Sequence, residues 1–473
     1  MHPHPIREKV RHPTRRVSAR GYPRPENLAR TYDATDLDRA VQAYRFFYPT
    51  VSGMAILAGA AKVGARANGV FALFEAQPKH VGFTYDSDAP IGLAPLDLTS
   101  SPVVVEVPPG PLVVVATDVH QRWIADLGLY GPDAGRGGKH LVLAPDSGSE
   151  VPSGFHVSRS SSMRAVLTVR SFFQGRQDVK AALDLTRAIR VRPLVPPADW
   201  AGPRWLDVTA PAHDTTPRAW ESGLEYWRVL HAVVDSEPAF DGYGAYYGEL
   251  AALGIAKGRP FSPDARLKRL LEEAAQLGKA EMCAQSFADR RPDRIAWRDR
   301  RWEWAALRHE GGDFMIDGHL DLEARDKWFY HSTGASPAVF RRDAGAAVAS
   351  WLGTHDRSGT YLDGGRSYAL RVPRPVPTRL FWSVTVYDAE TRSQIQTDQG
   401  RAALRSHHEL VETSKHADAE ITLSFGPAPP EEGPAHHWIQ TLPGRGWFAY
   451  LRVYAPEAAA FDGGWKPGDF TIA

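Results

Sequence analysis

The chain has 473 residues, of which 43% are hydrophobic and 23% charged, so it has enough apolar residues for more than one globular core. Its 56 lysines and arginines balance its 55 aspartates and glutamates, which excludes a strong overall field for nucleic acid or an anionic membrane. A single cysteine, Cys283, excludes an intramolecular disulfide framework and a cysteine-based zinc site.

The N-terminal 30 residues are rich in proline and arginine, which predicts a disordered basic arm over 1–30. After Arg15 and Arg16 there is no apolar run of about 7–15 residues of the kind that a signal peptide needs. The sequence also lacks a stretch that is long and apolar enough to span a bilayer. We therefore expect a cytoplasmic protein with no membrane partner and no nucleic-acid partner.

Residues 31–195 predict an N-terminal β-rich domain that begins with helices. Thr35 and Asp38 resemble a capping box at the start of the first helix, and Pro49 is expected to end that helix. Two β-branched runs, Val103–Val107 and Leu112–Val119, are separated by a Pro-Gly turn and predict a β-hairpin. Further strands are predicted over 139–145 and 163–173, and a helix over 178–194.

Between residues 196 and 330 the apolar residues follow helical spacing, which predicts a helical connector. From residue 331 to 473 short alternating strands return, and the predicted ones cover 366–372, 380–388, 420–426 and 448–455. We therefore expect a mainly β protein with a helical connector, α+β overall, whose two β domains are sandwich-like or jelly-roll-like.

Several segments resemble a known pair of domains. They include APLDLTSSPVVVEVPP, LDGGRSYALRVPRPVPTRLFWSVTVYDAETRSQIQTDQ and HWIQTLPGRGWFAYLRVYAPEAAAFDGGWKP. The chain resembles proteins that carry the domain of unknown function 1254 followed by the domain of unknown function 1214. The resemblance implies two β-rich domains joined by helices and no settled activity. His437 stands where the family usually has an asparagine, so the chemistry at that position is expected to differ.

The histidine pairs give little indication of a metal site. Adjacent side chains on a strand point to opposite faces, so neither His407-His408 nor His436-His437 can chelate one ion by itself. We therefore assign no metal ligand, and the sequence specifies no cofactor. A metal-dependent enzyme remains a third alternative, with ligands that are distant in the sequence.

A polar and aromatic set in the C-terminal domain is the first candidate site. Its members are Asp388, Arg392, His437, Trp438, Tyr450, Arg452 and Tyr454. In this hypothesis His437 is a general acid or base and Asp388 orients it. Arg392 or Arg452 would anchor a ligand anion between aromatic walls. The alternative is that an arginine between tyrosines on a strand is simply packed by its stem and by cation–π contact.

A second candidate lies in the N-terminal domain, in the segment TDVHQRW. Asp118 and Trp123 lie where a predicted strand enters a loop, and binding residues are often found at such strand ends. The alternative is an aspartate whose hydrogen bonds fix its own loop.

The sequence thus predicts a protein that binds a small polar or sugar-like ligand in an aromatic-rimmed cleft, with hydrolase or lyase acid–base chemistry as an extension. The alternative function is a non-catalytic interaction or scaffold protein that forms a homo-oligomer through its tyrosine-rich face.

Overall fold

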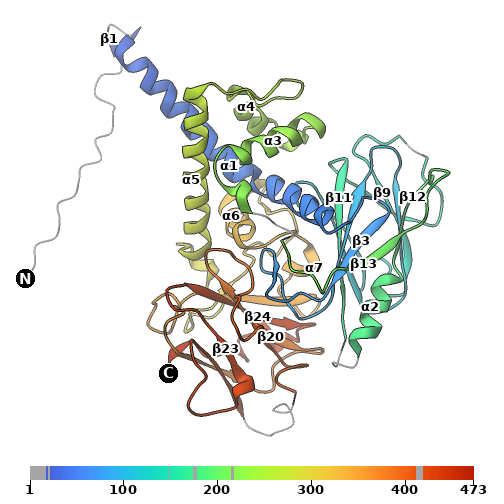
Figure 1. Ribbon diagram of the computed structural model, residues 1–473, viewed down its shortest axis with the longest axis vertical. Coiled ribbons are helices and arrows are strands. Elements are labelled where there is room, and N and C mark those ends of the chain that lie inside the picture. The colour runs from blue at the N-terminus through green and yellow to red at the C-terminus, as the bar shows by residue number, and fades with distance from the viewer. Residues whose placement is uncertain (1–17, 20–21, 149, 174–177, 215–217, 412–418) are drawn as a thin grey trace, which may run out of the picture.

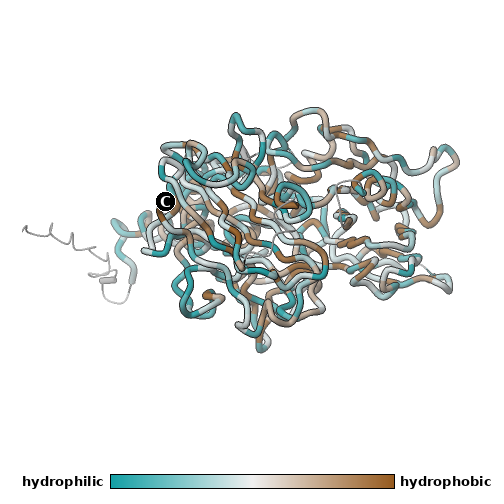
Figure 2. Tube along the Cα trace, turned by 90° about the horizontal axis from the view of Figure 1, so that it is seen from below, coloured by the Kyte–Doolittle hydropathy of each residue, from teal (hydrophilic) through white to brown (hydrophobic). Residues whose placement is uncertain are grey.

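The computed structural model of the protein describes residues 18–19, 22–148, 150–173, 178–214, 218–411 and 419–473 (Figure 1). Most of the predicted basic arm therefore lies outside the described residues. No helix among the described residues is both long and apolar enough to cross a membrane. Hydrophobic segments gather in the interior and hydrophilic ones in the outer loops (Figure 2).

The long helix α1, Pro25–Lys62, connects the helical part of the molecule to the N-terminal sheets (Figure 1). It begins before Thr35, so the predicted start at a capping box is wrong. It also continues past Pro49, so the prediction that this proline ends the helix is wrong. The reason is tertiary: Tyr48 and Val51, on either side of the proline, are fully buried, and their packing outweighs the backbone hydrogen bond that Pro49 cannot donate.

A group of helices packs against α1. The helices are α3 Leu224–Ser236, α4 Gly244–Ala252, α5 Ala265–Phe287 and α6 Leu322–His331. Asp264 and Asp321 cap α5 and α6, because their carboxylates accept the backbone N–H of Leu267 and Ala324. The core of this group includes Trp227 and extends to strands of the C-terminal sheet.

Two sheets build the N-terminal β-rich region. The six-stranded sheet has the order β13 Arg204–Asp207, β3 Val70–Phe74, β5 Ile91–Asp97, β11 Arg164–Ser171, β7 Leu112–Asp118 and β8 Trp123–Gly128. The four-stranded sheet has the order β10 His156–Arg159, β9 Gly138–Leu143, β6 Val103–Val107 and β12 Arg190–Pro193. Helix α2, Val179–Arg187, precedes β12, so the helix predicted over 178–194 is present in its first part and wrong in its second.

The strands β6 and β7 are present as predicted, but the predicted hairpin between them is wrong. They belong to different sheets, so the Pro-Gly turn carries the chain from one sheet to the other. The two sheets share a core, to which β6 contributes Val103 and Val105 and β7 contributes Val114 and Ala116. Both strands are apolar on successive residues because each sheet is also covered on its second face.

Two further sheets build the C-terminal region. The five-stranded sheet has the order β15 Glu303–Trp304, β18 Val348–Gly353, β24 Trp447–Tyr454, β20 Trp382–Asp388 and β21 Ala403–Arg405. The four-stranded sheet has the order β23 Trp438–Gln440, β22 Glu420–Gly426, β19 Tyr368–Pro373 and β25 Thr471–Ile472. The short elements are β1 Ser18–Ala19, β2 Tyr22–Pro23, β4 His80–Val81, β14 His213–Asp214, β16 Met315–Ile316, β17 His319–Leu320 and α7 Pro337–Phe340.

The alternation predicted for β20 and β24 is confirmed. Val384 of β20 lies opposite Leu451 of β24, and both belong to the C-terminal core. Tyr387 and Tyr450 lie on the other face and pack in the helical core. In coarse terms the expected β-rich regions and intervening helices are present, although helices make up a larger share of the molecule than a mainly β fold would have.

Candidate functional site

Two compartments adjoin the end of β7. The first, here called the outer cleft, has a volume of about 390 Å³. Its polar and charged lining residues are Asp118, Arg122, Asp146, Arg159, Ser160 and Ser161, and Trp123 and Phe240 contribute aromatic rings. The second, here called the inner cavity, has a volume of about 190 Å³ and is mainly apolar. Asp118 lines both compartments.

Asp118 is placed by the turn that follows β7. Its carboxylate accepts a hydrogen bond from the backbone N–H of Arg122 at 2.8 Å and another from the hydroxyl of Ser161. Gln121, inside this turn, has the left-handed φ of 58°. Asp118 therefore fixes its own loop, as one interpretation of the sequence had it, while it also lines the two compartments.

The aromatic part of the outer cleft is Trp123, the first residue of β8, which is 43% exposed. The guanidinium of Arg122 lies 3.7 Å from the ring centre of Phe240 and donates to the Ser161 hydroxyl at 3.3 Å. The structure thus brings the predicted Asp118 and Trp123 together in one cleft, beside an arginine that the sequence interpretation had not singled out.

Positive and negative side chains are equal in number in the lining of the outer cleft. Arg159 is held by three backbone carbonyls, since one of its terminal nitrogens donates to Ala144 and Pro145 at 2.9 Å and to Ser147 at 3.2 Å. Two arginines and two aspartates line the same volume. Such a surface suits a ligand that offers both hydrogen-bond donors and acceptors and carries little net charge.

The inner cavity lies against the second face of the six-stranded sheet. Strands β5, β7 and β11 supply its wall, with Leu93, Val115 and Val166 among the apolar side chains. The segment 328–339 and the middle of α1 cover it. Arg170 also reaches the cavity, where it forms an ion pair with Asp86. The cavity was missed in the sequence because its residues have the pattern of ordinary core strands.

In the C-terminal domain the structure brings Tyr450, Arg452 and Tyr454 together on one face of β24, where all three are buried. Arg452 donates to the hydroxyl of Tyr387 at 2.8 Å and to the backbone oxygen of Thr84 at 3.3 Å, and it lies 4.4 Å from the ring centre of Tyr450. The guanidinium is therefore used in contacts within the chain.

The same face meets the segment before β5. The hydroxyl of Tyr454 donates to Asp88 at 2.8 Å, and the hydroxyl of Ser383 donates to the same carboxylate oxygen at 2.7 Å. Burial raises the pKa of Asp88 to about 6, and the neighbouring Asp86 carboxylate adds to the rise. This face of β24 is thus a polar contact between segments that are far apart in the sequence.

Asp388 is the last residue of β20, and Arg392 lies in the loop that follows. The Asp388 carboxylate accepts the backbone N–H of Thr391 at 2.8 Å and the Nε of Arg445 at 2.7 Å. Although burial opposes its ionisation, these donors hold the pKa of Asp388 below its ordinary value. Arg392 is fully buried, forms an ion pair with Glu221 and lies 4.4 Å from the ring centre of Tyr330. Both side chains therefore connect parts of the fold.

His437 and Trp438 lie at the four-stranded C-terminal sheet. His437 ends a short 3₁₀ turn before β23, and the indole of Trp438 donates to the backbone oxygen of Gly426 at 3.1 Å. Burial lowers the pKa of His437, and the adjacent His436 lowers it further. The charged neighbour that lowers the pKa of Asp388 is Arg445, whereas the one that lowers the pKa of His437 is His436. The two groups thus have different surroundings. Their acid–base partnership stays a prediction.

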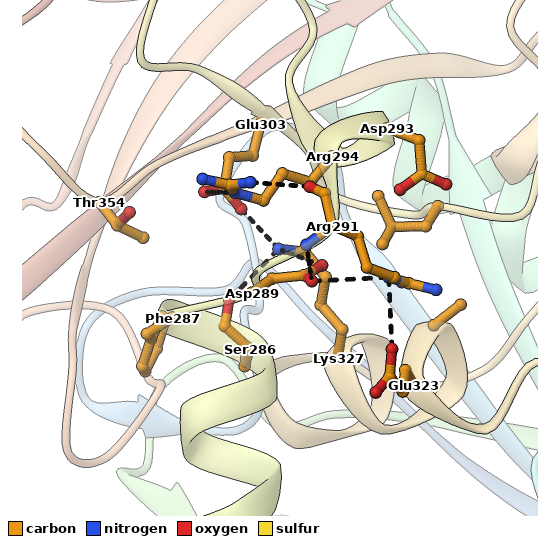
Figure 3. Close-up of polar contacts among 12 residues, drawn as sticks. Ser286, Phe287, Asp289, Arg291, Asp293, Arg294, Glu303, Glu323, Lys327 and Thr354 are labelled. Carbon is orange, nitrogen blue, oxygen red and sulfur yellow. Dashed lines mark hydrogen bonds and ion pairs between the residues drawn. The ribbon is translucent and has the colours of Figure 1, made fainter.

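A cluster of charges that the sequence did not indicate surrounds Lys327 of α6 (Figure 3). The ammonium group is fully buried and donates to Glu303 at 2.5 Å and to the backbone oxygen of Ser286 at 3.3 Å. Glu303 also accepts from Arg294 at 3.0 Å, and Asp289 lies 3.7 Å from the ammonium. These contacts tie α6 to β15, which carries Glu303, and to the end of α5. Their scattered positions leave no motif that could have revealed them.

Within the ranges that the structure describes, no group of three or more His, Cys, Asp or Glu side chains could hold a metal ion.

Comparison with known proteins gives the family context. Residues 70–193 match the family described as Protein of unknown function (DUF1254), and residues 347–458 match the one described as Protein of unknown function (DUF1214). The chain therefore carries both domains, in the order that the sequence resemblance predicted. No curated protein matches the chain.

Two solved structures are similar to the chain. The VPA0106 protein from Vibrio parahaemolyticus is 17% identical, with a TM-score of 0.55, and the match covers 93% of this chain and 100% of that one. An uncharacterized protein from Burkholderia cenocepacia is 11% identical, with a TM-score of 0.42, and the match covers 95% and 97% of the two chains. At this identity the first likeness shows the fold alone.

Proposed function

We propose that this protein, which carries a DUF1254 domain followed by a DUF1214 domain, binds a small polar, sugar-like ligand in the outer cleft. One observation carries the proposal: a volume of about 390 Å³ joins the 43%-exposed indole of Trp123 to oriented polar and charged side chains. Small-molecule sites typically combine aromatic walls with a few fixed polar groups.

The chemistry of a sugar fits these surfaces. A sugar ring has an apolar C–H face, which can lie on an indole, and an edge of hydroxyls that donate and accept hydrogen bonds. Arg122 and Arg159 supply donors, and Asp146 supplies an acceptor, on the same lining. The balance of two arginines against two aspartates favours a neutral ligand over a phosphate or a polycation.

The proposal is binding without catalysis in this cleft. The Asp118 carboxylate already accepts hydrogen bonds from a backbone N–H and from the Ser161 hydroxyl, so its role is to hold the loop in place. Hydrolase or lyase chemistry at His437 and Asp388 stays a prediction. We also propose that the two β-rich regions are sandwiches or jelly rolls.

The tyrosine-rich face expected to form a homo-oligomer is buried within the chain, so it offers no surface to another copy. Association with another copy stays a second candidate function, and the start of α1 favours it. There Leu28 and Tyr32 lie one helical turn apart and are 36% and 63% exposed. We expect the Leu28→Glu, Tyr32→Glu double variant to reduce the molar mass measured by light scattering, if the wild type is larger than one chain of 52.1 kDa. A wild type of 52.1 kDa at all concentrations contradicts this candidate.

The test of the ligand is calorimetric titration of the wild type with a panel of mono- and disaccharides. We expect at least one saccharide to bind the wild type and to bind Trp123→Ala at least tenfold more weakly, because the stacking surface is lost. Tyr361→Ala is the matched control, since Tyr361 is a 52%-exposed aromatic residue outside the cleft lining. Absence of any saccharide binding overturns the ligand class, and equal binding by Trp123→Ala overturns the place.

A further inference from the structure

The six-stranded N-terminal sheet has two apolar faces, and only one of them packs against the four-stranded sheet. In β7, Leu112, Val114 and Ala116 point to the core between the sheets, whereas Val113 and Val115 point to the inner cavity. Strand β11 alternates in the same way. The second face is therefore mainly apolar, and the elements that cover it leave about 190 Å³ unfilled.

The covering elements are fixed in place and cannot settle onto the sheet. Helix α1 crosses at Gly53, where an added Cβ would overlap the carbonyl oxygen of Val119. The helix backbone is thus already in contact with the loop after β7. Backbone atoms of α1 and of the loop block a closer approach of the helix to the sheet. The helix therefore cannot close the inner cavity by moving toward the sheet.

Gln121 holds the two covering elements together. Its amide nitrogen donates to the backbone oxygen of Pro49 in α1 at 2.8 Å, and its amide oxygen accepts the backbone N–H of Gly334 at 2.8 Å. The indole of Trp328, which also lines the cavity, donates to the Gly334 oxygen at 2.7 Å. A buried and fully used amide thus acts as a brace between α1 and the segment 328–339.

The charges at the cavity wall select against an anion. Arg170 forms an ion pair with Asp86, which compensates its positive charge. Asp118 adds a carboxylate to the wall. A second negative charge inside the cavity would therefore find no free cation among the lining residues, whereas the hydroxyls of Thr117 and Thr168 can meet a neutral polar substituent.

We propose that the inner cavity is a preformed binding site for a neutral apolar molecule, or for the apolar part of a larger one, with the size of a single aromatic ring. The volume exceeds that of the engineered apolar cavity of about 150 Å³ that binds benzene. Wall atoms around an empty cavity lack dispersion partners, and a ligand of this shape supplies them. The site shares Asp118 with the outer cleft, but it takes a different class of ligand and does not depend on the sugar-like ligand.

The test uses toluene, benzyl alcohol and sodium benzoate as probes, with thermal unfolding and ¹H–¹³C NMR of labelled valine and leucine methyls as readouts. We expect toluene and benzyl alcohol to raise the midpoint of the wild type saturably and to shift methyl signals of Val115 and Val166. Benzoate should bind at least tenfold more weakly than benzyl alcohol. No effect of toluene up to its solubility overturns the proposal, and tighter binding of benzoate overturns the neutral class.

Cavity-filling variants localise the binding. Val115→Phe places a ring in the cavity, so it should abolish the toluene effect, and Ala335→Val is the milder variant if Val115→Phe does not fold. Retention of toluene binding by a folded filling variant overturns the site. Trp123→Ala should bind toluene as the wild type does, because Trp123 lines only the outer cleft. Failure of the sugar test and failure of this one are therefore distinguishable.

Discussion

At the end of β7, Asp118 and Trp123 border open volume, whereas on β24 Tyr450, Arg452 and Tyr454 are covered by other parts of the chain. The two regions carry the same kinds of side chain: a charged group, aromatic rings and hydrogen-bonding atoms near the end of a strand. In the C-terminal region the partner is internal, since the segment that carries Thr84 and Asp88 supplies the carbonyl and carboxylate. In the N-terminal region Asp118 is also bound within the chain, but the outer cleft beside it and Trp123 leaves a volume of about 390 Å³ for the proposed ligand.

Different residues are expected to determine stability and ligand binding. Buried charges require partners, because an uncompensated charge in the interior is very costly. The C-terminal residues and Arg392 should therefore determine whether the protein folds. In the outer cleft, the exposed Trp123 should matter little for folding and much for binding, whereas Asp118 also fixes its own loop.

The largest effect is expected for Arg392→Ala. Arg392 and Glu221 are both fully buried, and the variant removes the cation on one carboxylate oxygen while Lys279 stays on the other at 2.9 Å. Breaking a buried pair in this way costs about 3–5 kcal/mol of the free energy of unfolding, which urea denaturation can measure. Arg371→Ala is the control: its ion pair with Glu420 is exposed, and such pairs contribute about 0–1 kcal/mol. Equal losses in the two variants contradict the distinction.

The second effect depends on pH and on Asp88. Its pKa is about 6 in the folded protein, against an ordinary value of 3.8, because the carboxyl is buried beside Asp86. The folded state thus keeps a proton that the unfolded chain loses, so the stability from this group is complete below pH 3.8 and is lost as the pH rises to about 6.

The measurement is the free energy of unfolding of wild type and Asp88→Asn between pH 3.8 and 6. The wild type should lose stability relative to the variant by at most about 3 kcal/mol, since one pKa unit corresponds to about 1.4 kcal/mol. The exposed Asp199→Asn serves as control. A difference that stays flat over this window, or that has the opposite sign, contradicts the environment described for Asp88.

A smaller effect is expected for Tyr454→Phe. The variant keeps the ring but removes the hydroxyl that donates to Asp88 at 2.8 Å. Loss of a hydrogen bond to a buried polar group costs about 1–3 kcal/mol, to be measured by thermal or urea unfolding. Tyr361→Phe, at an exposed tyrosine, should stay close to the wild type. If the two variants are equally stable, the Tyr454 contact with Asp88 does not stabilise the fold.

The smallest effect on stability is expected for Trp123→Ala. Trp123 is 43% exposed, and surface substitutions of this kind usually change the free energy of unfolding by no more than about 0.5 kcal/mol. The same variant should weaken ligand binding in the outer cleft at least tenfold. If Trp123→Ala loses much stability and binds the ligand as the wild type does, Trp123 serves folding and not binding.

The sequence by itself determined much of the local structure. The alternation in 380–388 and 448–455 predicted β20 and β24 and their two faces, because successive side chains of a strand point to opposite sides. It also singled out Asp118 and Trp123, since polar and aromatic residues that follow a strand often lie in binding loops. The order of the two domains followed from the resemblance of their motifs.

Only the tertiary structure decided which elements meet. The turn between β6 and β7 looks like a hairpin turn, but pairing is set by the neighbours β9 and β11 in their respective sheets. Pro49 remains inside α1 because its buried neighbours pack, and the inner cavity exists because α1 cannot approach the sheet beyond Gly53. Periodicity is a property of neighbouring residues, whereas pairing, burial and empty space depend on contacts between distant segments, which a single sequence does not display.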